Sequence, residues 1–293
     1  MKEDTSIISR NKVIELIFEI AKSPNAFDII EERLKDLSKE ELSGSIIECG
    51  MLPESFDHDS SEEKLWAKYS DILLAHSLNF LGVSAEVLRV RGNAADVFGK
   101  ARNYTIIGDA KTFRLSRTAK NQKDFKIKAL DDWRRSNDYA VLTSPFYQYP
   151  SLRSQIYSQA IERNVTLLSY VHLKFLLDFH TNQDLTKLWE TGKRLKDELK
   201  PKDYQYAQIY WGVIDETVCS ILGKKIDLLK DYKKIEIAKT KEIGQEGIKY
   251  WQNKIEEYKK LSKEEAVEKL IKAEKIGAKI ETIKKVINKD FTI

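Results

Sequence analysis

Asp109 and Lys111 stand at the end of an apolar segment, and their side chains could act together. Residues 104–108 (YTIIG) are short and mostly apolar, as in a buried strand. Side chains two positions apart in a strand point to the same face, so Asp109 and Lys111 should lie side by side. An acid and an amine at the end of a buried strand are unusual unless they face a cleft, a metal ion or each other.

A second acid, Asp96, precedes Asp109 by thirteen positions. Two carboxylates can hold a hard divalent cation such as Mg²⁺, which leaves coordination positions for water and for a phosphate oxygen. The cation neutralises charge developing on phosphorus and lowers the pKa of a water ligand, while an ammonium group orients that water or stabilises the phosphorane. Asp96, Asp109 and Lys111 therefore predict Mg²⁺-dependent hydrolysis of phosphodiester bonds.

The acid-x-lysine triplet by itself is a weak indication, because the chain contains six of them. They begin at Glu62, Asp109, Asp124, Glu198, Asp231 and Glu257. Five lie in charged, helical-looking stretches, where a solvated helix surface with i,i+4 ion pairs explains them. Only Asp109 follows an apolar strand and has another acid upstream across a turn. On spacing alone, a structural ion pair between Asp109 and Lys111 remains the alternative to a nuclease site.

Residues 114–128, a few positions after this triplet, contain six basic residues and one acid. Lysine and arginine neutralise phosphates, while asparagine, glutamine and lysine can bond to base edges in the major groove. An alanine could pack against a thymine methyl group. We predict that this segment reads DNA next to the bond that is cut, with an ordinary basic helix start as the alternative. The expected DNA-binding residues are Arg114, Arg117, Ala119, Lys120, Asn121, Gln122 and Lys123.

Strands and helices alternate between about residues 60 and 180. The predicted strands are 87–90, 95–99, 104–111, 139–143 and 165–169, and the predicted helices start near 60, 120, 151 and 171. This order indicates an α/β fold with a mixed central sheet flanked by helices. The first fifty residues and everything after about 185 have helical patterns. We therefore expect a core in residues 1–185 with N-terminal helices, and a helical C-terminal subdomain in 186–293 that packs with it and serves dimerisation or clamps DNA.

Composition and the absence of certain motifs argue against several other classes of protein. The net charge of +4 does not by itself predict nucleic-acid binding. The two cysteines lie far apart and are expected to be buried thiols in a reducing compartment. The four histidines share no ligand spacing, and there is no phosphate-binding glycine loop, dinucleotide fingerprint or nucleophile elbow. No apolar run is long enough for a membrane span and no signal peptide is recognisable, so we expect a soluble, cytoplasmic protein.

Several longer runs resemble the HindIII-like type II restriction endonucleases of the PD-(D/E)xK nuclease superfamily. They are residues 91–94, 96–97, 109–126, 128–130, 138–143 and 148–150, with weaker similarity at 63–65, 250–251 and 264–266. The resemblance implies a restriction-endonuclease-like fold and a homodimer that hydrolyses duplex DNA with Mg²⁺, for which Mn²⁺ can substitute. It also implies a palindromic AAGCTT target cut between the adenines, which leaves 5′-phosphates on 5′ overhangs, and a cognate DNA methyltransferase in the same system.

The same resemblance assigns roles to single residues. Asp96, Asp109 and the carbonyl of Ala110 would be metal ligands, and Lys111 would be the catalytic lysine. Asp124 and a helical acid, Glu63, would be further catalytic residues, with helix capping as the alternative for each. The sequence departs from the family motif because Ala95, not proline, precedes Asp96, and because the interval to Asp109 is short. A structure-specific repair nuclease and a catalytically inactive DNA-binding protein remain as competing interpretations.

Overall fold

The computed structural model describes residues 9–89, 94–117 and 122–287 of the chain. Its centre is a five-stranded sheet in the order β1-β2-β3-β4-β5. The strands are β1 (Ser84–Val87), β2 (Val97–Lys100), β3 (Thr105–Ala110), β4 (Tyr139–Ser144) and β5 (Val165–Ser169). The first three strands pair antiparallel, and β3, β4 and β5 pair parallel. The predicted mixed α/β sheet is therefore confirmed.

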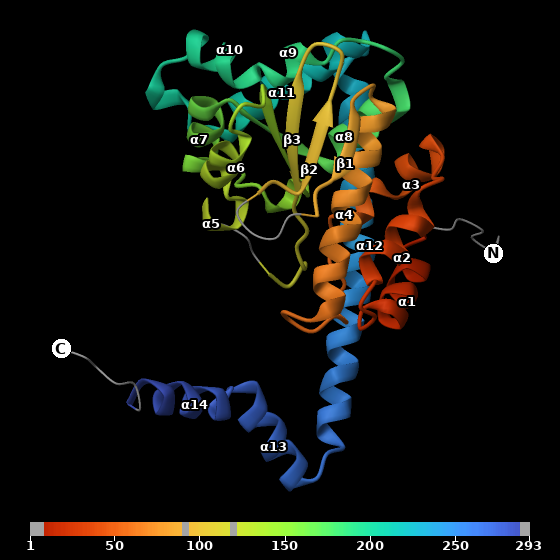
Figure 1. Ribbon diagram of the computed structural model, residues 1–293, viewed down its shortest axis with the longest axis vertical. Coiled ribbons are helices and arrows are strands. Elements are labelled where there is room, and N and C mark those ends of the chain that lie inside the picture. Colours follow the sequence, from red (N-terminus) through yellow and green to blue (C-terminus); the bar gives the residue numbers. More distant parts are fainter. Residues whose placement is uncertain (1–8, 90–93, 118–121, 288–293) are drawn as a thin grey trace. The chain divides into compact units, whose positions relative to one another are not determined.

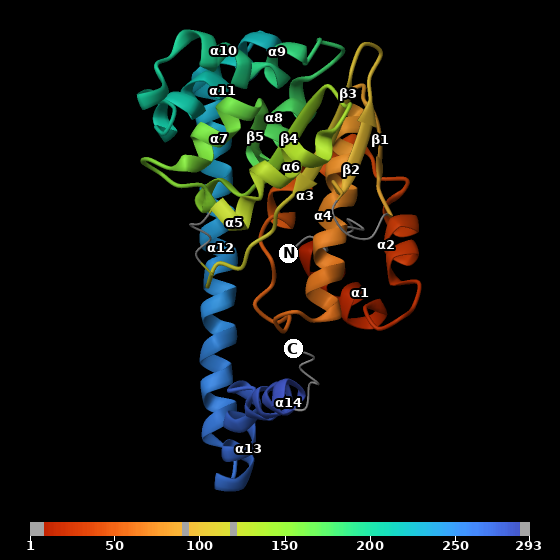
Figure 2. The same cartoon turned by 60° about the vertical axis from the view of Figure 1, so that its left-hand side comes forward.

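Helices flank this sheet on both sides, as the views of Figures 1 and 2 show. Helix α4 (Ser61–Phe80) runs along β1, β2 and β3, and α8 (Tyr170–Phe179) packs against β5, α3 and α4. Helices α6 (Ile127–Arg134) and α7 (Gln155–Arg163) pack against each other and against β3, β4 and β5. Gly108 lets α4 approach the sheet, because a Cβ atom there would lie 3.1 Å from Leu74 Cδ2.

Three N-terminal helices extend the core beside α4. They are α1 (Arg10–Ile20), α2 (Ala26–Leu34) and α3 (Lys39–Cys49). Ser38 and Glu41 form the capping box that the sequence predicts at the start of α3. At α4, the Ser60 hydroxyl accepts a hydrogen bond from the amide of Glu63 at 3.1 Å, which satisfies one of the free N–H groups of the first turn.

Two predicted elements differ from those observed. The helix expected over residues 120–135 is divided into α5 (Gln122–Phe125) and α6, because Lys126 has a positive φ of 51° that no continuous helix can accommodate. The first strand is Ser84–Val87 rather than 87–90. The side chain of Asn79 fixes it earlier, since it bonds both the amide and the carbonyl of Ala85 at 2.8 and 3.0 Å. Residues 90–93 lie outside the described residues.

After residue 185 the described part of the chain contains helices and no strand, as predicted. They are α9 (Thr186–Trp189), α10 (Thr191–Glu198), α11 (Ala207–Leu222), α12 (Ile226–Lys259), α13 (Lys263–Ala273) and α14 (Ile276–Ile287). Residues 1–244 form one compact unit and residues 245–293 a second. The subdomain boundary at 185 stays a prediction; α9, α10, α11 and the first half of α12 belong to the first unit.

Helix α12 covers the core of the first unit with Leu229, Glu236 and Ile243, which repeat every seven residues and are all buried. The carboxylate of Glu236 accepts a hydrogen bond from the amide of Phe146 at 2.7 Å, and its other oxygen has no partner. Burial raises the pKa of Glu236 to about 7, although this hydrogen bond and the nearby Lys233 lower it. Folding therefore favours the protonated carboxyl group.

Glu236→Gln should stabilise the protein at high pH and leave its stability at low pH nearly unchanged. A folded pKa above the unfolded value gives stability that is complete below pH 4.5 and is lost as the pH rises through 7. The amide can still accept from Phe146 but never ionises, so the gain in the free energy of unfolding should approach about 3 kcal/mol above pH 8. Urea unfolding of both proteins from pH 4.5 to 8.5 measures it. Glu242→Gln, at an exposed position of α12, is the control, and parallel stability curves for the parent and Glu236→Gln would contradict the prediction.

Cys49 and Cys219 are both buried and unbridged, in agreement with the sequence. In the described part of the chain, no helix combines the length and apolar character that a membrane crossing requires.

Candidate active site

Three carboxylates meet where β3 ends. Asp109 is the next-to-last residue of β3, and Asp96 directly precedes β2. Because Val97 pairs with Gly108 in the antiparallel register, Asp96 and Asp109 are brought opposite one another. Asp71, from the middle of α4, is the third member. One oxygen of each of the three lies within 4.8 Å of the others, and we call Asp71, Asp96 and Asp109 the acidic cluster.

Lys111 is beside the cluster, as the two-residue spacing predicts. Its ammonium group is 2.5 Å from Asp109 Oδ2. The main chain holds it in place, because its amide donates to Thr143 O at 2.8 Å and its carbonyl accepts from the Tyr170 hydroxyl at 3.0 Å. Burial lowers the pKa of Lys111, but the negative charge of the acidic cluster, above all Asp109, outweighs burial and raises it above 10.5. Lys111 is therefore a cation suited to stabilising negative charge.

Lys68 and Asp71 were not predicted from the sequence. Lys68, one turn before Asp71 on α4, places its ammonium group 2.5 Å from Asp96 Oδ1 and 3.0 Å from Asp71 Oδ2. Burial and the negative charge of Asp96 and Asp109 raise the pKa of Asp71 to about 8, and Lys68 opposes this shift. A sequence signal existed: Asp71 interrupts the apolar stripe of α4 within a run of buried positions, where an isolated acid requires a partner.

The acidic cluster has the properties of a site for a divalent cation. All its donors are hard oxygens, which Mg²⁺ and Mn²⁺ prefer. The side chain of Asp109 is 2% exposed, and its buried Oδ2 lies 2.5 Å from the ammonium group of Lys111. Three carboxylates held this closely repel one another, and a divalent cation between them would relieve that repulsion. Ala110 is buried next to Asp109, and a role for its carbonyl stays a prediction.

Glu63 and Arg114 form a separate group near the start of α4. Arg114 is 2.9 Å from Glu63 Oε1 and donates to the carbonyl of Phe56 at 2.7 Å, and its side chain is 11% exposed. Glu63 also lies near His58 and Asp59, with which it forms a second group of possible ligands. The structure thus places Glu63 outside the acidic cluster and gives Arg114 partners within the protein. The roles of Glu63 in catalysis and of Arg114 in DNA binding stay predictions.

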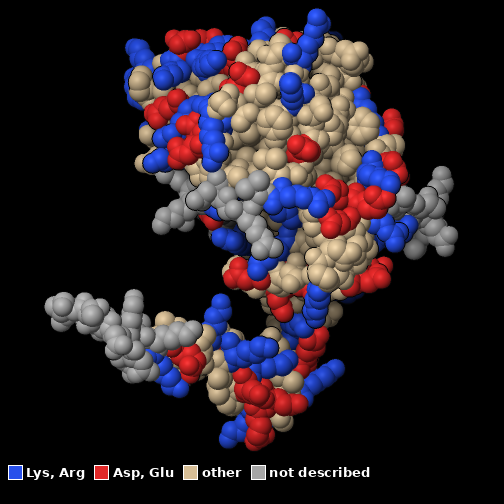
Figure 3. All heavy atoms as spheres, viewed as in Figure 1, with Lys and Arg blue, Asp and Glu red and all other residues tan. Residues whose placement is uncertain are grey.

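The remaining predicted residues surround the start of α5. Asp124 lies 3.1 Å from Arg117, whose side chain is 55% exposed, and Asp124 does not belong to the acidic cluster. Gln122 and Lys123 lie within α5. Ala119, Lys120 and Asn121 fall outside the described residues, so their expected contacts with DNA stay predictions. On the face drawn in Figure 3, lysine and arginine are intermixed with aspartate and glutamate rather than gathered into one basic area.

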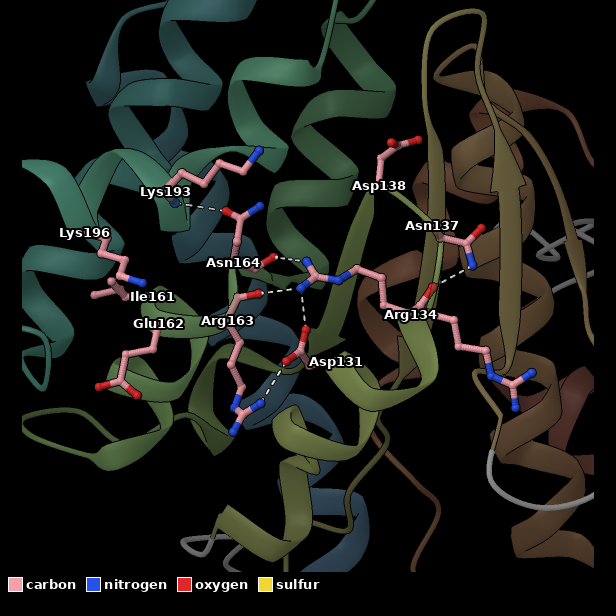
Figure 4. A pocket seen from close by; sticks show the side chains of 11 residues that line it. Asp131, Arg134, Asn137, Asp138, Ile161, Glu162, Arg163, Asn164, Lys193 and Lys196 are labelled. Atoms are coloured by element: carbon pink, nitrogen blue, oxygen red, sulfur yellow. Dashed lines mark hydrogen bonds and ion pairs between the residues drawn. The ribbon is translucent and has the colours of Figure 1, made fainter.

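A cavity of about 690 Å³ lies at the other end of the strands, where β4 and β5 begin. Figure 4 shows Arg134 in this cavity, donating to the carbonyls of Arg163 and Asn164 and paired with Asp131. Its guanidinium group is thus used to tie α6 to the end of α7. No member of the acidic cluster lines this cavity, so its size does not make it the reaction site.

A serine, a histidine and an aspartate also form a hydrogen-bonded chain. The Ser169 hydroxyl is 2.7 Å from His172 Nδ1, and His172 Nε2 is 2.8 Å from Asp215 Oδ1. Ser169 and His172 are fully buried, and the ring of Trp211 stacks on His172. No substrate can reach this serine, and the chain of hydrogen bonds instead caps α8 and links it to α11.

The fold and the sheet-end carboxylates define the class of protein first. A five-stranded mixed sheet flanked by helices, with Asp109 and Lys111 at the end of its central strand and Asp96 directly before the neighbouring strand β2, is a restriction-endonuclease-like fold.

Sequence comparison then identifies the family. Residues 11–287 match the HindIII restriction endonuclease family. The type II restriction enzyme HindIII of Haemophilus influenzae is 37% identical over 262 residues, which cover 84% of each chain. The chain therefore belongs to the HindIII restriction endonuclease family. It is a type II restriction endonuclease, that is, a site-specific deoxyribonuclease, as the sequence runs around Asp109 predict.

Proposed function

We propose that the protein hydrolyses duplex DNA at the palindromic sequence AAGCTT in a Mg²⁺-dependent reaction that leaves 5′-phosphates on 5′ overhangs. The observation that carries the proposal is the acidic cluster beside Lys111 in a chain 37% identical to HindIII. Mn²⁺ is proposed to substitute for Mg²⁺, since both are hard cations that take oxygen ligands.

In this proposal Asp96, Asp109 and the carbonyl of Ala110 hold the cation, which supplies charge neutralisation and a more acidic water. Lys111 contributes a fixed positive charge beside Asp109, where negative charge develops on the phosphoryl oxygens. Because Asp109 pairs with Leu142 of β4 and the amide of Lys111 donates to the carbonyl of Thr143, Asp109 and Lys111 are held in a fixed mutual position. Asp71 adds a third carboxylate from α4.

A palindromic target requires two copies of the site related by two-fold symmetry, so the active form is proposed to be a homodimer. The segment 114–123 is proposed to contact bases and phosphates beside the cut. A cognate methyltransferase would protect the same site in the host DNA, and both proteins would act in the cytoplasm.

The function is tested with a plasmid that carries one AAGCTT site, incubated with and without Mg²⁺, followed by sequencing of the ends. Cleavage between the adenines only when Mg²⁺ is present supports the proposal. Metal-dependent cleavage at another sequence rejects the target, and a requirement for nicks or free ends indicates a structure-specific nuclease. Binding of AAGCTT without cleavage would indicate an inactive DNA-binding protein.

Lys123→Ala or Asn121→Ala should reduce discrimination between AAGCTT and sites that differ by one base. Each correct contact to a base edge is worth roughly 1–3 kcal/mol, which corresponds to about a 5- to 150-fold change in relative cleavage. Competition between a cognate and a one-base-variant oligonucleotide measures it. Lys196→Ala, at an exposed position of α10 beside the cavity at the other end of the strands, is the control. Unchanged specificity in both variants would place base recognition elsewhere.

A further inference from the structure

Lys68 contacts two of the three carboxylates that would hold a metal ion. Its ammonium group bridges Asp96 Oδ1 at 2.5 Å and Asp71 Oδ2 at 3.0 Å. Asp96 is itself an expected metal ligand, and the three carboxylates offer oxygens within 4.8 Å of one another. A divalent cation and the ammonium group of Lys68 would therefore compete for the same carboxylates.

We propose that Lys68 is a resident cation of the acidic cluster, which a divalent metal ion must displace before the site becomes active. This inference rests on the proposed function, because it takes the acidic cluster to be the metal site.

Charge balance supports the exchange. The cluster contains three carboxylates, and two ammonium groups, those of Lys68 and Lys111, contact it. Without metal, these ammonium groups offset the negative charge that burial makes unfavourable. A divalent cation supplies the same compensation, and it repels an ammonium group that contacts the same carboxylates.

The side chain of Lys68 is exposed enough to leave the site. Its side chain is 36% exposed, whereas that of Lys111 is 19% exposed and lies against the buried Asp109. The flexible four-carbon stem of a lysine allows the ammonium group to swing into solvent without moving α4. Displacement would leave Lys111 in place and release the ammonium group of Lys68 at the rim of the site, where it can form an ion pair with a DNA phosphate.

The first experiment measures Mn²⁺ binding to the full-length protein without DNA, from the electron paramagnetic resonance signal of free Mn²⁺. We expect Lys68→Gln to bind Mn²⁺ at least about tenfold more tightly than the parent protein, because the competing charge is gone. Lys64→Gln, at an exposed position one turn earlier on α4, should bind like the parent. Asp109→Asn should lose the tight site.

The outcomes separate this inference from the proposed function. Equal or weaker Mn²⁺ binding by Lys68→Gln, while Asp109→Asn still loses the site, overturns the displacement of Lys68 and leaves the metal site intact. Unchanged Mn²⁺ binding by Asp109→Asn shows that the acidic cluster is not the metal site. That result rejects both the proposed metal site and the displacement of Lys68.

A second experiment uses the parent protein, so it does not depend on the stability of the variant. Limited acetylation followed by mass spectrometry compares the reactivity of Lys68 with and without Mn²⁺. We expect the acetylation of Lys68 to rise when Mn²⁺ is added, while that of Lys64 is unchanged. Constant or reduced acetylation of Lys68 at saturating Mn²⁺ contradicts its displacement.

Discussion

Asp109→Asn is expected to abolish DNA cleavage while the protein still binds duplex DNA in the absence of metal. The substitution keeps the size of the side chain but removes the negative charge at the centre of the acidic cluster, so the cation loses a principal ligand. Metal assistance stabilises the transition state by several kcal/mol, so the rate should fall by at least about 10³-fold. Single-turnover cleavage of a labelled duplex at saturating protein measures the loss.

Asp138→Asn is the matched control for this prediction. Asp138 directly precedes β4, at the other end of the strands from Asp109. Its carboxylate accepts hydrogen bonds from the amide and hydroxyl of Thr105 at 2.7 and 2.9 Å. An asparagine there keeps an acceptor oxygen, so cleavage should persist. Cleavage by Asp109→Asn at the rate of the parent protein would place the reaction elsewhere in the chain.

Lys111→Gln is expected to slow cleavage by about 10²- to 10³-fold, the usual effect of removing one group that stabilises developing negative charge. Glutamine retains a hydrogen-bond donor but no charge, and Lys111 is the ammonium group closest to Asp109, at 2.5 Å. The loss should persist at saturating Mg²⁺, because Lys111 is not a metal ligand. Cleavage rates measured over a titration of Mg²⁺ distinguish a lower maximal rate from a weaker dependence on metal.

Lys100→Gln is the control for Lys111, since Lys100 is exposed at the end of β2 in the same sheet. A variant at position 111 that regains the full rate at high Mg²⁺ would show that the lysine only assists metal binding. In that case a stabilising role for its charge in the reaction would be wrong.

Local patterns were sufficient to predict Asp96, Asp109 and Lys111 as neighbours. The apolar run before Asp109 indicated β3, and the alternation of side chains along a strand places Asp109 and Lys111 together. Asp96 followed because a short antiparallel connection brings the residue before β2 next to the end of β3. These neighbour relations depend only on residues close in the sequence, so they can be predicted from a sequence pattern.

Asp71 and Lys68 could not be predicted in this way, because their place at the site depends on how α4 crosses the sheet. That crossing is set by packing between distant residues, such as Leu74 against Gly108. The break at Lys126 was missed for a different reason. A single lysine with positive φ, between two segments of helical pattern, is imposed by tertiary packing and leaves no mark on the spacing of apolar residues.

The register of β3 has a consequence for how activity can be lost. Val97 faces Gly108 on one side, and Leu142 faces Asp109 on the other. A slip by one residue would turn every side chain of β3 to the other face, so Asp109 and Lys111 would leave the site together. No intermediate pairing exists between the two registers. A change of register in β3 should therefore inactivate a molecule completely, and it should lower the number of active molecules rather than the cleavage rate of each one.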